Sequence, residues 1–503
     1  MAKRPAKVNP LRWSMPPLAG AVFTLGLEPW NLWPLIPVSA GLLCLLLHRQ
    51  RTDSAGLIGW LYGFGFFGAG ASWVYVSIHV HGHAAVPLAI ALTLIFCVGL
   101  ALLFALQAWL YRRFFQHHFL APLLAFPGLW VLFEWSRSWL LTGFPWLYAG
   151  YGGIDSPLAH WAPISGVFGL SLVLVMLGSM GVILARARGW RPLVSLWLLL
   201  AAIGFIGGAA LGNVSWTKAT GEPLQVSIVQ PNIPQEKKWD PRFLPSMLER
   251  FENTTASLYA DSDLVLWPEA AVPAINRRGQ LFLDHSAEEA ARANSALVAG
   301  IASRGERGFH NSIVALGTGS GIYHKQKLVP FGEYVPLEHW LRGLIEFFDL
   351  PMSNFTSGDA QQKPLQVAAL TIAPFICYEV VYPDFVAKSA IGSHLLITVS
   401  NDSWFGASIG PWQHLQMARF RALETQRPLL RGTNNGVSAI VDSRGQSRTQ
   451  SGQFIEAVVS GTVQPRTGST PFMRFGSLPV LMVSGIFVAL CSQRKRRDTR
   501  RYW

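Results

Sequence analysis

The chain has 503 residues, more than one ordinary domain of about 100 to 200 residues requires. Only 14% of the residues are charged and 50% are hydrophobic, against about 25% charged residues in a typical soluble domain. This composition argues against a wholly soluble enzyme, a disordered chain and a fibrous repeat. The formal net charge of +13 suits a nucleic-acid or membrane partner, so its distribution along the chain must decide between them.

Long segments without Asp, Glu, Lys or Arg predict eight membrane crossings. One crossing needs about 20 apolar residues in a helix, and the uncharged stretch 54–111 is long enough for two, with a bend at His79 to His83 and Pro87. In chain order, the eight predicted spans occupy residues 16–27, 33–47, 54–111 (two spans), 114–133, 156–185, 192–217 and 475–493.

The basic residues alternate between the connections of these spans, as the positive-inside rule requires of cytoplasmic loops. Seventeen basic and two acidic residues, a net charge of +15, lie in the even-numbered connections and the tails, which leaves 24 basic and 26 acidic residues elsewhere. The positive charge therefore marks the cytoplasmic face, with both termini on that side, and gives no support to nucleic-acid binding. No small-residue cleavage site follows the first span, so we expect it to be retained. The seventeen are Lys3, Arg4, Lys7, Arg12, Arg49, Arg51, Arg112, Arg113, Arg186, Arg188, Arg191, Arg494, Lys495, Arg496, Arg497, Arg500 and Arg501.

A long polar region between the seventh and eighth spans predicts an exported domain. Short β-branched runs alternate there with helical segments, a pattern typical of an α/β domain with helices covering a sheet. The expected organisation is a membrane bundle over 1–213, an extracytoplasmic domain over 214–474, and a last span with a basic tail over 475–503. Expected strands are 225–230, 264–267, 296–301, 312–316, 367–377, 395–400, 437–441 and 457–463, and expected helices are 241–260, 286–294 and 410–425. Residues 317–321 (GTGSG) predict a hairpin turn.

Three predicted strand ends in this domain carry reactive groups, namely Glu269, Lys325 and Cys377. Ligand sites of α/β sheets lie beyond the carboxyl ends of the strands, so these three side chains can converge. A cysteine thiolate attacks acyl carbonyls, a carboxylate can take the thiol proton, and a lysine can balance the oxyanion. Taken singly, Glu269 is better explained as a helix N-cap and Lys325 as a solvated loop cation, and only their joint placement with Cys377 favours a reactive set.

Cys377 is distinguished from the other cysteines by its position. Cys44, Cys97 and Cys491 fall in apolar spans and are expected to be small buried hydrophobic residues. Cys377 alone lies in the exported domain, where a thiol without a pairing partner is a liability unless it has a use. With four cysteines so distributed, no disulfide framework is predicted.

Longer motifs give the chain a family resemblance. Trp267-Pro268-Glu269, the Lys325 segment and Cys377-Tyr378-Glu379 resemble the Glu-Lys-Cys triad of the nitrilase, or carbon-nitrogen hydrolase, superfamily. Further motifs resemble its integral membrane branch, the apolipoprotein N-acyltransferase family, over nearly the whole chain. Pro231 stands where many members have Gly, outside the triad. The further motifs are 229–235 (VQPNIPQ), 238–241 (KWDP), 328–336 (LVPFGEYVP), 400–406 (SNDSWFG), 413–419 (QHLQMAR) and 431–436 (RGTNNG).

The resemblance implies an eight-span bundle joined to an αββα sandwich in a bacterial inner-membrane protein with a periplasmic catalytic domain. Its implied activity moves a fatty acyl chain from a glycerophospholipid, typically phosphatidylethanolamine, to the α-amino group of the N-terminal diacylglyceryl-cysteine of an apolipoprotein. A thioester on Cys377 carries the acyl group between the two substrates. The implied chemistry uses no metal and no cofactor, and a monomer is the default.

The resemblance also implies roles around the triad. Glu333 and Glu379 would support the triad, and the Tyr378 backbone N–H would join Lys325 at the oxyanion. Trp239, Asn311 and Trp404 would line the substrate pocket. Arg137 would either bind a phospholipid phosphate or pair with Glu134, and the apolar stretch 340–355 would form a lid over the site.

Two other functions compete with this one. A membrane-tethered amidase acting on a small molecule would have the same triad, but eight spans exceed what a tether needs. A transporter with an accessory domain would place ionisable residues within its spans, and these spans contain almost none.

Overall fold

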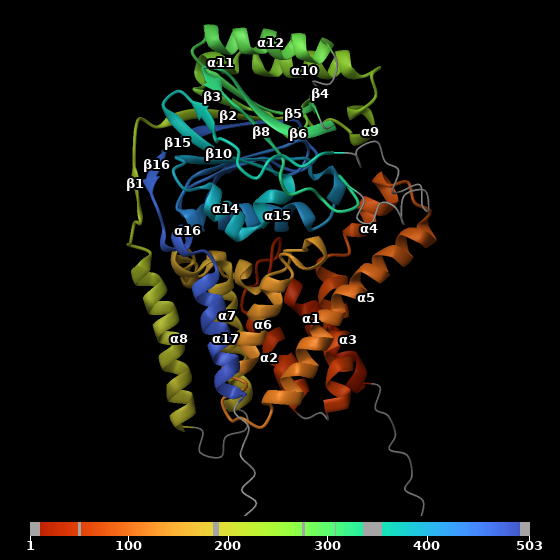
Figure 1. The fold of residues 1–503 in the computed structure, drawn as a ribbon, viewed down its shortest axis with the longest axis vertical. Coiled ribbons are helices and arrows are strands. Elements are labelled where there is room, and N and C mark those ends of the chain that lie inside the picture. Colours follow the sequence, from red (N-terminus) through yellow and green to blue (C-terminus); the bar gives the residue numbers. More distant parts are fainter. Residues whose placement is uncertain are drawn as a thin grey trace, which may run out of the picture.

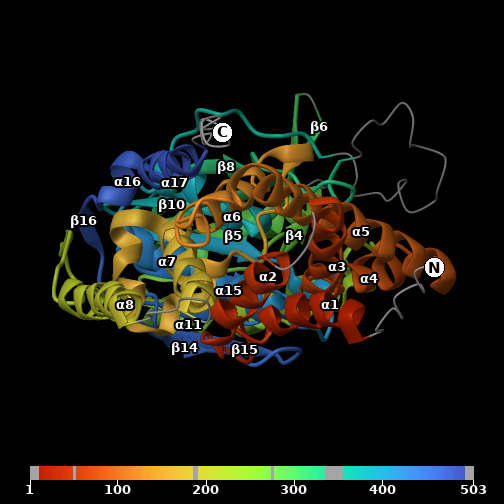
Figure 2. The ribbon, with the colours of Figure 1, turned by 90° about the horizontal axis from the view of Figure 1, so that it is seen from below.

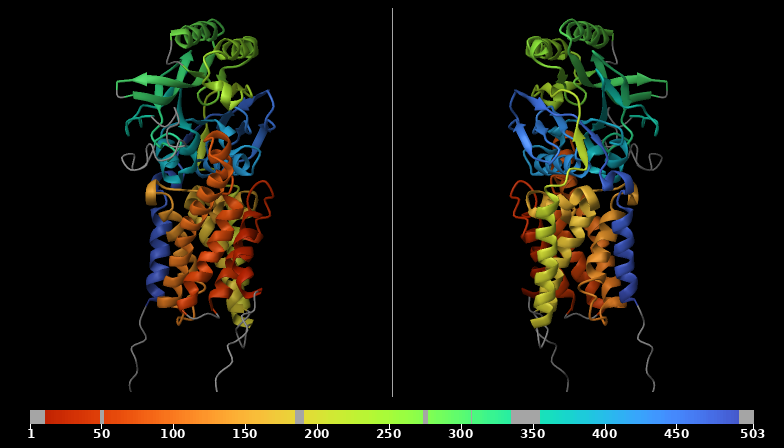
Figure 3. Two further views of the ribbon diagram at one scale, coloured as in Figure 1. Left: turned by 90° about the vertical axis from the view of Figure 1, so that its right-hand side faces the viewer. Right: turned by 90° about the vertical axis from the view of Figure 1, so that its left-hand side faces the viewer.

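The structure is a computed structural model that describes residues 11–48, 52–184, 191–273, 277–306, 308–334 and 355–492. A bundle of apolar helices lies below an α/β domain (Figure 1). The bundle helices run roughly along the long axis of the molecule, and the α/β domain is stacked on one end of the bundle (Figure 3). The molecule therefore has an apolar half and a mixed half, as the distribution of charge predicts.

Each predicted span coincides with at least one apolar helix. By length and composition, the helical segments Val86–Phe115 and Pro157–Gly181 are long enough to cross a membrane, and a bent pair makes a third if it counts as one span. The described helices therefore meet this criterion for two or three crossings, fewer than the eight predicted. The bundle helices are α1 (Leu11–Thr24), α2 (Leu35–His48), α3 (Thr52–Gly70), α5 (Val86–Leu110), α6 (Ala125–Ser136), α7 (Ala162–Leu184), α8 (Arg191–Leu211) and α17 (Leu478–Cys491).

The bent pair reaches from the bundle to the α/β domain. The chain turns by 63° after α3 and continues through α4 (Val74–Val76) into a π-helical turn, Ser77–His81. There the Ser77 hydroxyl donates to the Trp404 carbonyl oxygen at 2.7 Å, and His81 Nε2 lies 2.7 Å from the Ser403 carbonyl oxygen. The sequence predicts a bend at His79 to His83, and the structure adds this earlier one.

Glycines allow the bundle helices to approach closely. A Cβ added to Gly65 of α3 would lie 1.9 Å from the Pro17 carbonyl oxygen of α1, and one on Gly178 of α7 would lie 2.0 Å from the Pro37 carbonyl oxygen of α2. Small residues at such crossings are typical of helix packing in membranes, where van der Waals contact holds the helices together. Viewed from below, α8 lies at one edge of the bundle and α5 at the other (Figure 2).

The α/β domain contains two large sheets. One has the order β15-β2-β3-β5-β6-β8 with β4 beside β5, and the other has the order β14-β13-β12-β11-β10-β9-β7. The first sheet comprises β2 (Leu224–Gln230), β3 (Leu264–Leu266), β4 (Val272–Pro273), β5 (Ala296–Gly305), β6 (Gly308–Gly317), β8 (Ile322–His324) and β15 (Ala457–Val463). The second comprises β7 (Gly319–Ser320), β9 (Leu365–Val367), β10 (Leu370–Ile376), β11 (Leu395–Ser400), β12 (Leu429–Thr433), β13 (Ala439–Val441) and β14 (Ser447–Gln450).

The two sheets pack face to face between layers of helices, which gives an αββα sandwich (Figure 1). Ile228 and Leu266 of the first sheet share a buried cluster with Ile397 and Val399 of the second. The outer layer has α10 (Leu244–Thr255), α11 (Leu258–Asp261) and α12 (Arg277–Arg292), and the layer facing the bundle has α14 (Pro383–Ser389) and α15 (Gly410–Thr425). A two-stranded sheet of β1 (Thr217–Ala219) and β16 (Arg466–Gly468) leads from α8 and towards α16 (Pro471–Phe475).

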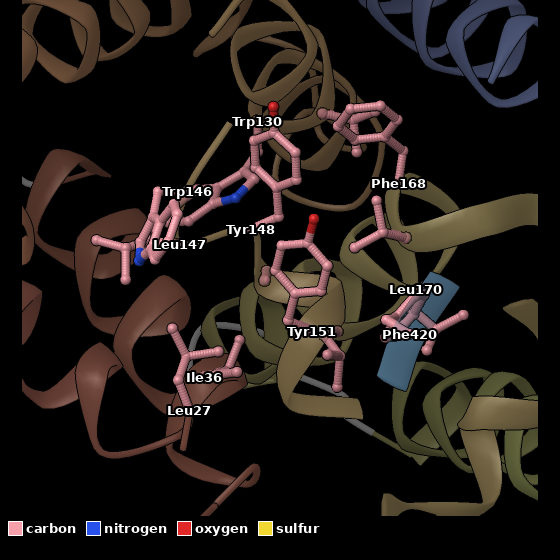
Figure 4. Packing of buried hydrophobic residues seen from close by; sticks show 14 of the residues in the cluster. Leu27, Ile36, Trp130, Trp146, Leu147, Tyr148, Tyr151, Phe168, Leu170 and Phe420 are labelled. Atoms are coloured by element: carbon pink, nitrogen blue, oxygen red, sulfur yellow. The ribbon is translucent and has the colours of Figure 1, made fainter. Parts of the chain in front are cut away.

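Helix α15 joins the two halves of the molecule. All but one of its residues are buried, because one side covers the second sheet and the other lies on the bundle. Its Phe420 ring packs edge-on against Tyr151 of the bundle at 5.4 Å, within the cluster drawn in Figure 4. The buried apolar cluster is continuous from the bundle into this helical layer, so the position of the α/β domain on the bundle is set by core packing.

Candidate active site

The three reactive residues named above come from both sheets. Glu269 follows β3 after Pro268, and Lys325 directly follows β8 of the same sheet. Cys377 directly follows β10 of the facing sheet. Hydrogen bonds and charge interactions link the three side chains, as the following contacts show, so the structure brings the predicted triad together.

Glu269 is held on both carboxylate oxygens. Its Oε1 accepts from Asn311 Nδ2 at 2.7 Å, and its Oε2 accepts from the Asn401 backbone N–H at 2.7 Å. The Lys325 ammonium lies 3.7 Å from Oε1. A buried carboxylate with these donors has a fixed orientation, which a base must have to take a proton from a defined direction.

Lys325 is almost fully buried between two carboxylates. Its Nζ donates to Glu333 at 2.8 Å. Burial works against its positive charge, but Glu333 and Glu269 outweigh burial and raise the pKa of Lys325. The lysine is therefore an ammonium at neutral pH, as a group that balances an oxyanion must be.

Asn311 connects the two carboxylates. Its Nδ2 donates to Glu269 at 2.7 Å and to Glu333 at 3.0 Å. Its buried Oδ1 has no hydrogen-bond partner among the described residues. The sequence comparison with the family predicts a pocket residue here, and the structure gives Asn311 a positioning role within the site.

Cys377 lies on a sharp turn between β10 and a 3-10 segment, Cys377–Val381. Its φ of 50° is in the left-handed region, which non-glycine residues rarely adopt and which often marks functional sites. Burial, followed by the charge of Glu269, raises the pKa of the thiol to about 12, against the opposing effects of Lys325 and Ser400. The sulfur is therefore a neutral thiol at rest, so a nucleophilic attack needs a base to remove its proton.

Glu379 ties the turn of Cys377 to the loop of Lys325. Its Oε2 accepts from the Ile376 backbone N–H at 2.8 Å, and its Oε1 accepts from the backbone N–H groups of Gln326 and Lys327 at 2.6 and 3.1 Å. The Tyr323 hydroxyl donates to the same oxygen at 2.9 Å. Glu379 thus connects the residue before Cys377 with the two residues after Lys325.

The sequence did not predict a network of buried polar side chains that contacts Cys377. The Ser400 hydroxyl contacts Cys377 Sγ at 3.5 Å and Asp402 Oδ1 at 2.6 Å. Buried His414 lies with its Nε2 3.2 Å from the Cys377 carbonyl oxygen, and Arg431 donates to Asp402 at 2.7 Å. Burial, followed by Arg431, lowers the pKa of His414, so a neutral imidazole donates to that carbonyl oxygen. These residues lie in the motifs 400–406, 413–419 and 431–436. The motifs were therefore the sequence feature from which the network could have been predicted.

A second buried lysine lies beside the triad. Lys238 Nζ donates to the Glu269 carbonyl oxygen at 2.7 Å, and burial lowers the pKa of Lys238 to about 8 against the charges of Glu269 and Cys377. The sequence contains this residue only as part of the 238–241 motif. In the structure, the Lys238 ammonium holds the main chain at Glu269 in place.

The remaining predicted site residues that the structure describes make no hydrogen bond with the side chains of Glu269, Lys325 or Cys377. Trp239 follows Lys238 and is half-buried, and its indole N–H has no hydrogen-bond partner among the described residues. Trp404 is half-buried, and its ring meets His81 at 5.2 Å. The Tyr378 hydroxyl donates to the Gly143 carbonyl oxygen at 3.0 Å, which points the side chain to the bundle. Of the predicted lid over 340–355, all but Phe355 lies outside the described residues.

Arg137 makes the internal contacts expected of one of its two predicted roles, the pairing with Glu134. It is 4% exposed, and its guanidinium donates to the Trp146 and Leu147 carbonyl oxygens at 3.0 and 3.4 Å. Glu134 lies 3.8 Å away. Its contacts are therefore internal, and they secure the loop whose Trp146 Nε1 donates to Gln413 Oε1 of α15 at 2.7 Å.

Replacing Arg137 with Met should lower the free energy of unfolding by about 3 to 5 kcal/mol, because buried Glu134 would lose its counter-charge. Thermal unfolding of the detergent-solubilised protein measures the loss. Arg137→Met combined with Glu134→Gln should recover part of it. Normal stability of the single variant would contradict this structural role.

Comparisons with known proteins agree with the motifs. Residues 19–180 match the family described as apolipoprotein N-acyltransferase N-terminal domain, and residues 225–472 match carbon-nitrogen hydrolase. An apolipoprotein N-acyltransferase of Pseudomonas syringae pv. tomato is 45% identical over 92% of this chain and 93% of its own. One from Pseudomonas aeruginosa is 46% identical over 96% of each chain.

Among solved structures, a CN-hydrolase superfamily protein of Xanthomonas campestris is 20% identical over 52% of this chain and 97% of its own, with a TM-score of 0.36. The identities of 45% and 46% extend over nearly the full length of the two relatives and of this chain. With both halves matched as well, the chain belongs to the apolipoprotein N-acyltransferase family.

Proposed function

We propose that the protein transfers a fatty acyl chain from a membrane phospholipid to the α-amino group of the N-terminal diacylglyceryl-cysteine of an apolipoprotein. The acyl chain passes through a thioester on Cys377. The observation that carries this proposal is the cluster of Glu269, Lys325 and Cys377 in a chain whose family is apolipoprotein N-acyltransferase. Phosphatidylethanolamine is the proposed donor, and a single chain is the proposed working unit.

The first half-reaction acylates the enzyme. Cys377 Sγ attacks the ester carbonyl of the phospholipid while Glu269 takes the thiol proton. Lys325 and the Tyr378 backbone N–H stabilise the oxyanion of the tetrahedral intermediate. The intermediate collapses with cleavage of the ester C–O bond, and Glu269 returns the proton to the departing oxygen, which releases a lysophospholipid.

The second half-reaction transfers the acyl group. The neutral α-amino group of the apolipoprotein attacks the thioester carbonyl, and the same donors hold the new oxyanion. An α-amino group has an ordinary pKa near 8, so part of it is already neutral at pH 7. Glu269 takes a proton from the attacking amine, the C–S bond breaks, and proton transfer to sulfur restores the Cys377 thiol.

The residues around the triad have proposed roles that follow their contacts. Glu333 holds the Lys325 ammonium, and Glu379 holds the turn of Cys377. Asn311 fixes the Glu269 carboxylate and has a buried Oδ1 without a partner among the described residues. Trp239 and Trp404 are proposed to line the space for the lipid chains.

The apolar half is proposed to cross the bacterial inner membrane eight times, with both termini in the cytoplasm and the catalytic domain in the periplasm. Residues 1–213 and 475–503 form the membrane part, and residues 214–474 form the catalytic domain. Support comes from the coincidence of apolar helices with all the uncharged segments and from the basic residues between them. Both substrates carry acyl chains, so a site stacked on a membrane bundle suits them.

An acceptor assay tests the function against the rival amidase. The purified full-length enzyme is incubated with phosphatidylethanolamine and a diacylated lipopeptide that has a free α-amino group, and mass spectrometry follows the lipopeptide. We expect a triacylated product, and none from the matched lipopeptide with an acetylated amine. Absence of product from the free amine, together with hydrolysis of small amides, would establish the amidase instead.

Replacing Glu379 with Gln should slow thioester formation about 10- to 100-fold. The carboxylate accepts on both oxygens from three backbone N–H groups, whereas an amide would turn its own N–H₂ towards one of them, and an unpaired buried donor costs about 1 to 3 kcal/mol. Rapid-quench measurement of the acyl-enzyme with phospholipid alone tests this. Exposed Glu249 of α10 supplies the control Glu249→Gln, and equal rates in both variants would exclude the linking role of Glu379.

A further inference from the structure

A polar cavity of about 130 Å³ lies where the α/β domain meets α7 and α8. The last residues of α8, the segment just before α7, the end of α15 and the β13–β14 turn all contribute to its wall. None of its lining residues belongs to the active site described above. The polar lining residues that matter here are His160, Asn213, Ser215, Gln426, Arg444 and Arg466.

The charge in this cavity is unbalanced. Two arginines and a histidine line it, and none of the described lining residues is acidic. Burial, followed by the charge of Arg444, lowers the pKa of Arg466, and the charge of Asp442 opposes both. The nearby carboxylate of Asp442 is paired with Arg448 at 2.7 Å. Such a cavity favours an anion.

Hydrogen bonds within the protein hold the guanidinium of Arg466 in a fixed position. Its Nε donates to Thr217 Oγ1 at 2.7 Å, and its Nη2 donates to Ser215 Oγ and to the Thr217 carbonyl oxygen, each at 2.7 Å. No hydrogen bond among the described residues uses its Nη1. On the same wall, Gln426 accepts from the Trp216 backbone N–H at 2.8 Å. A preformed arginine with unused N–H groups binds an oxyanion at little cost in conformational entropy.

The cavity lies at the boundary between the apolar and polar surfaces. Below it, α8 exposes large apolar side chains, with Leu199 56% and Ile206 70% exposed. Leu211, the last residue of α8, lines the cavity, and this helix runs from the far end of the bundle up to the α/β domain (Figure 1). In the proposed membrane orientation, this is the level of the outer-leaflet phosphate groups. The unused Nη1 of Arg466 and the guanidinium of Arg444 can each form charge-assisted hydrogen bonds with phosphate oxygens.

We infer that this cavity binds the phosphate group of an outer-leaflet anionic phospholipid, which anchors the catalytic domain on the membrane surface and is not the acyl donor. Arg444 and Arg466 hold the phosphate oxygens, and the acyl chains lie along the apolar side of α8. The inference rests on the proposed membrane orientation. It does not depend on the acyl-transfer chemistry, so a binding experiment tests it separately.

The test measures binding of phosphatidylglycerol to the full-length protein in phosphatidylcholine nanodiscs. Arg444→Gln is the main variant, because the Arg444 side chain makes no ion pair among the described residues and its loss spares the fold. We expect about tenfold weaker retention of phosphatidylglycerol, as for loss of one charged hydrogen-bonding group. The control is Lys388→Gln, an exposed basic residue of α14 that does not line the cavity, and it should bind as wild type does. Equal retention in wild type and Arg444→Gln would overturn the inference.

Two further arms separate the possible sources of the phosphate group. Inorganic phosphate at concentrations equal to the lipid should fail to displace phosphatidylglycerol, because it lacks the chains that lie along α8. Complete displacement would show a free-phosphate site and overturn the lipid assignment. The acyl-transfer rate of Arg444→Gln in detergent should equal that of wild type, and a loss of that rate with unchanged lipid binding would also contradict the anchoring role.

Discussion

Replacing Cys377 with Ala should abolish both half-reactions, with a loss of activity on the order of 10⁴-fold or more, as for removal of a catalytic nucleophile elsewhere. No other described cysteine lies in the α/β domain, since Cys44, Cys97 and Cys491 are buried in bundle helices. Intact-protein mass spectrometry after incubation with phospholipid alone should detect an acyl adduct on wild type and none on the variant. The triacylated lipopeptide should be absent as well.

Cys97→Ala is the matched control for this experiment. Cys97 is a buried thiol of α5, so its loss removes a cysteine without touching the site. We expect this variant to form the adduct and the product at the wild-type rate. Triacylated product from Cys377→Ala would contradict the covalent mechanism, whereas loss of the adduct from Cys97→Ala would show that the assay reports folding and not the nucleophile.

Replacing Glu269 with Gln should slow thioester formation by about 10² to 10⁴-fold at pH 7, the usual contribution of a general base. An amide keeps much of the shape of the carboxylate but cannot take the thiol proton. The reaction must then proceed through the small thiolate fraction of Cys377, whose thiol has a pKa of about 12 next to Glu269. Loss of that negative charge will lower the thiol pKa somewhat, but burial, the larger cause, remains.

The rate of the Glu269→Gln variant should rise with pH. Below the thiol pKa, the thiolate fraction rises tenfold for each pH unit, so the rate of Glu269→Gln should climb about tenfold per unit from pH 7 to 9. Wild type, with its base in place, should change far less over that range. The measurement is the rapid-quench rate of acyl-enzyme formation from phospholipid alone. The exposed Glu236 of α9 (Gln235–Lys238) supplies the control Glu236→Gln, and a flat profile for Glu269→Gln would exclude Glu269 as the base.

Local patterns in the sequence predict much of this fold. The bounds expected for 395–400, 410–425 and 457–463 are those of β11, α15 and β15, because each is a continuous run with a clear start and end. The glycine-rich residues 317–321 connect β6 to β8, which pair antiparallel as the predicted hairpin requires, but they also contain β7, which pairs with β9 of the second sheet. Strand β12 was missed, since Arg431 and Thr433 interrupt its apolar run. Both residues are nevertheless fully buried, and Arg431 is paired with Asp402.

The sequence by itself determined that the protein has an apolar half and an α/β half, and it predicted Glu269, Lys325 and Cys377 as a reactive set. Charge gaps and strand-end positions are local properties that one chain displays directly. Only the tertiary structure decided what Asn311, Glu379, His414 and Arg137 do. Each of the four acts through partners that folding brings to it. Asn311 joins two carboxylates, Glu379 joins two loops, His414 holds the carbonyl of the nucleophile, and Arg137 is enclosed by backbone oxygens and Glu134. The physical reason is that hydrogen bonding and desolvation depend on distances in space, which residue type and spacing do not specify.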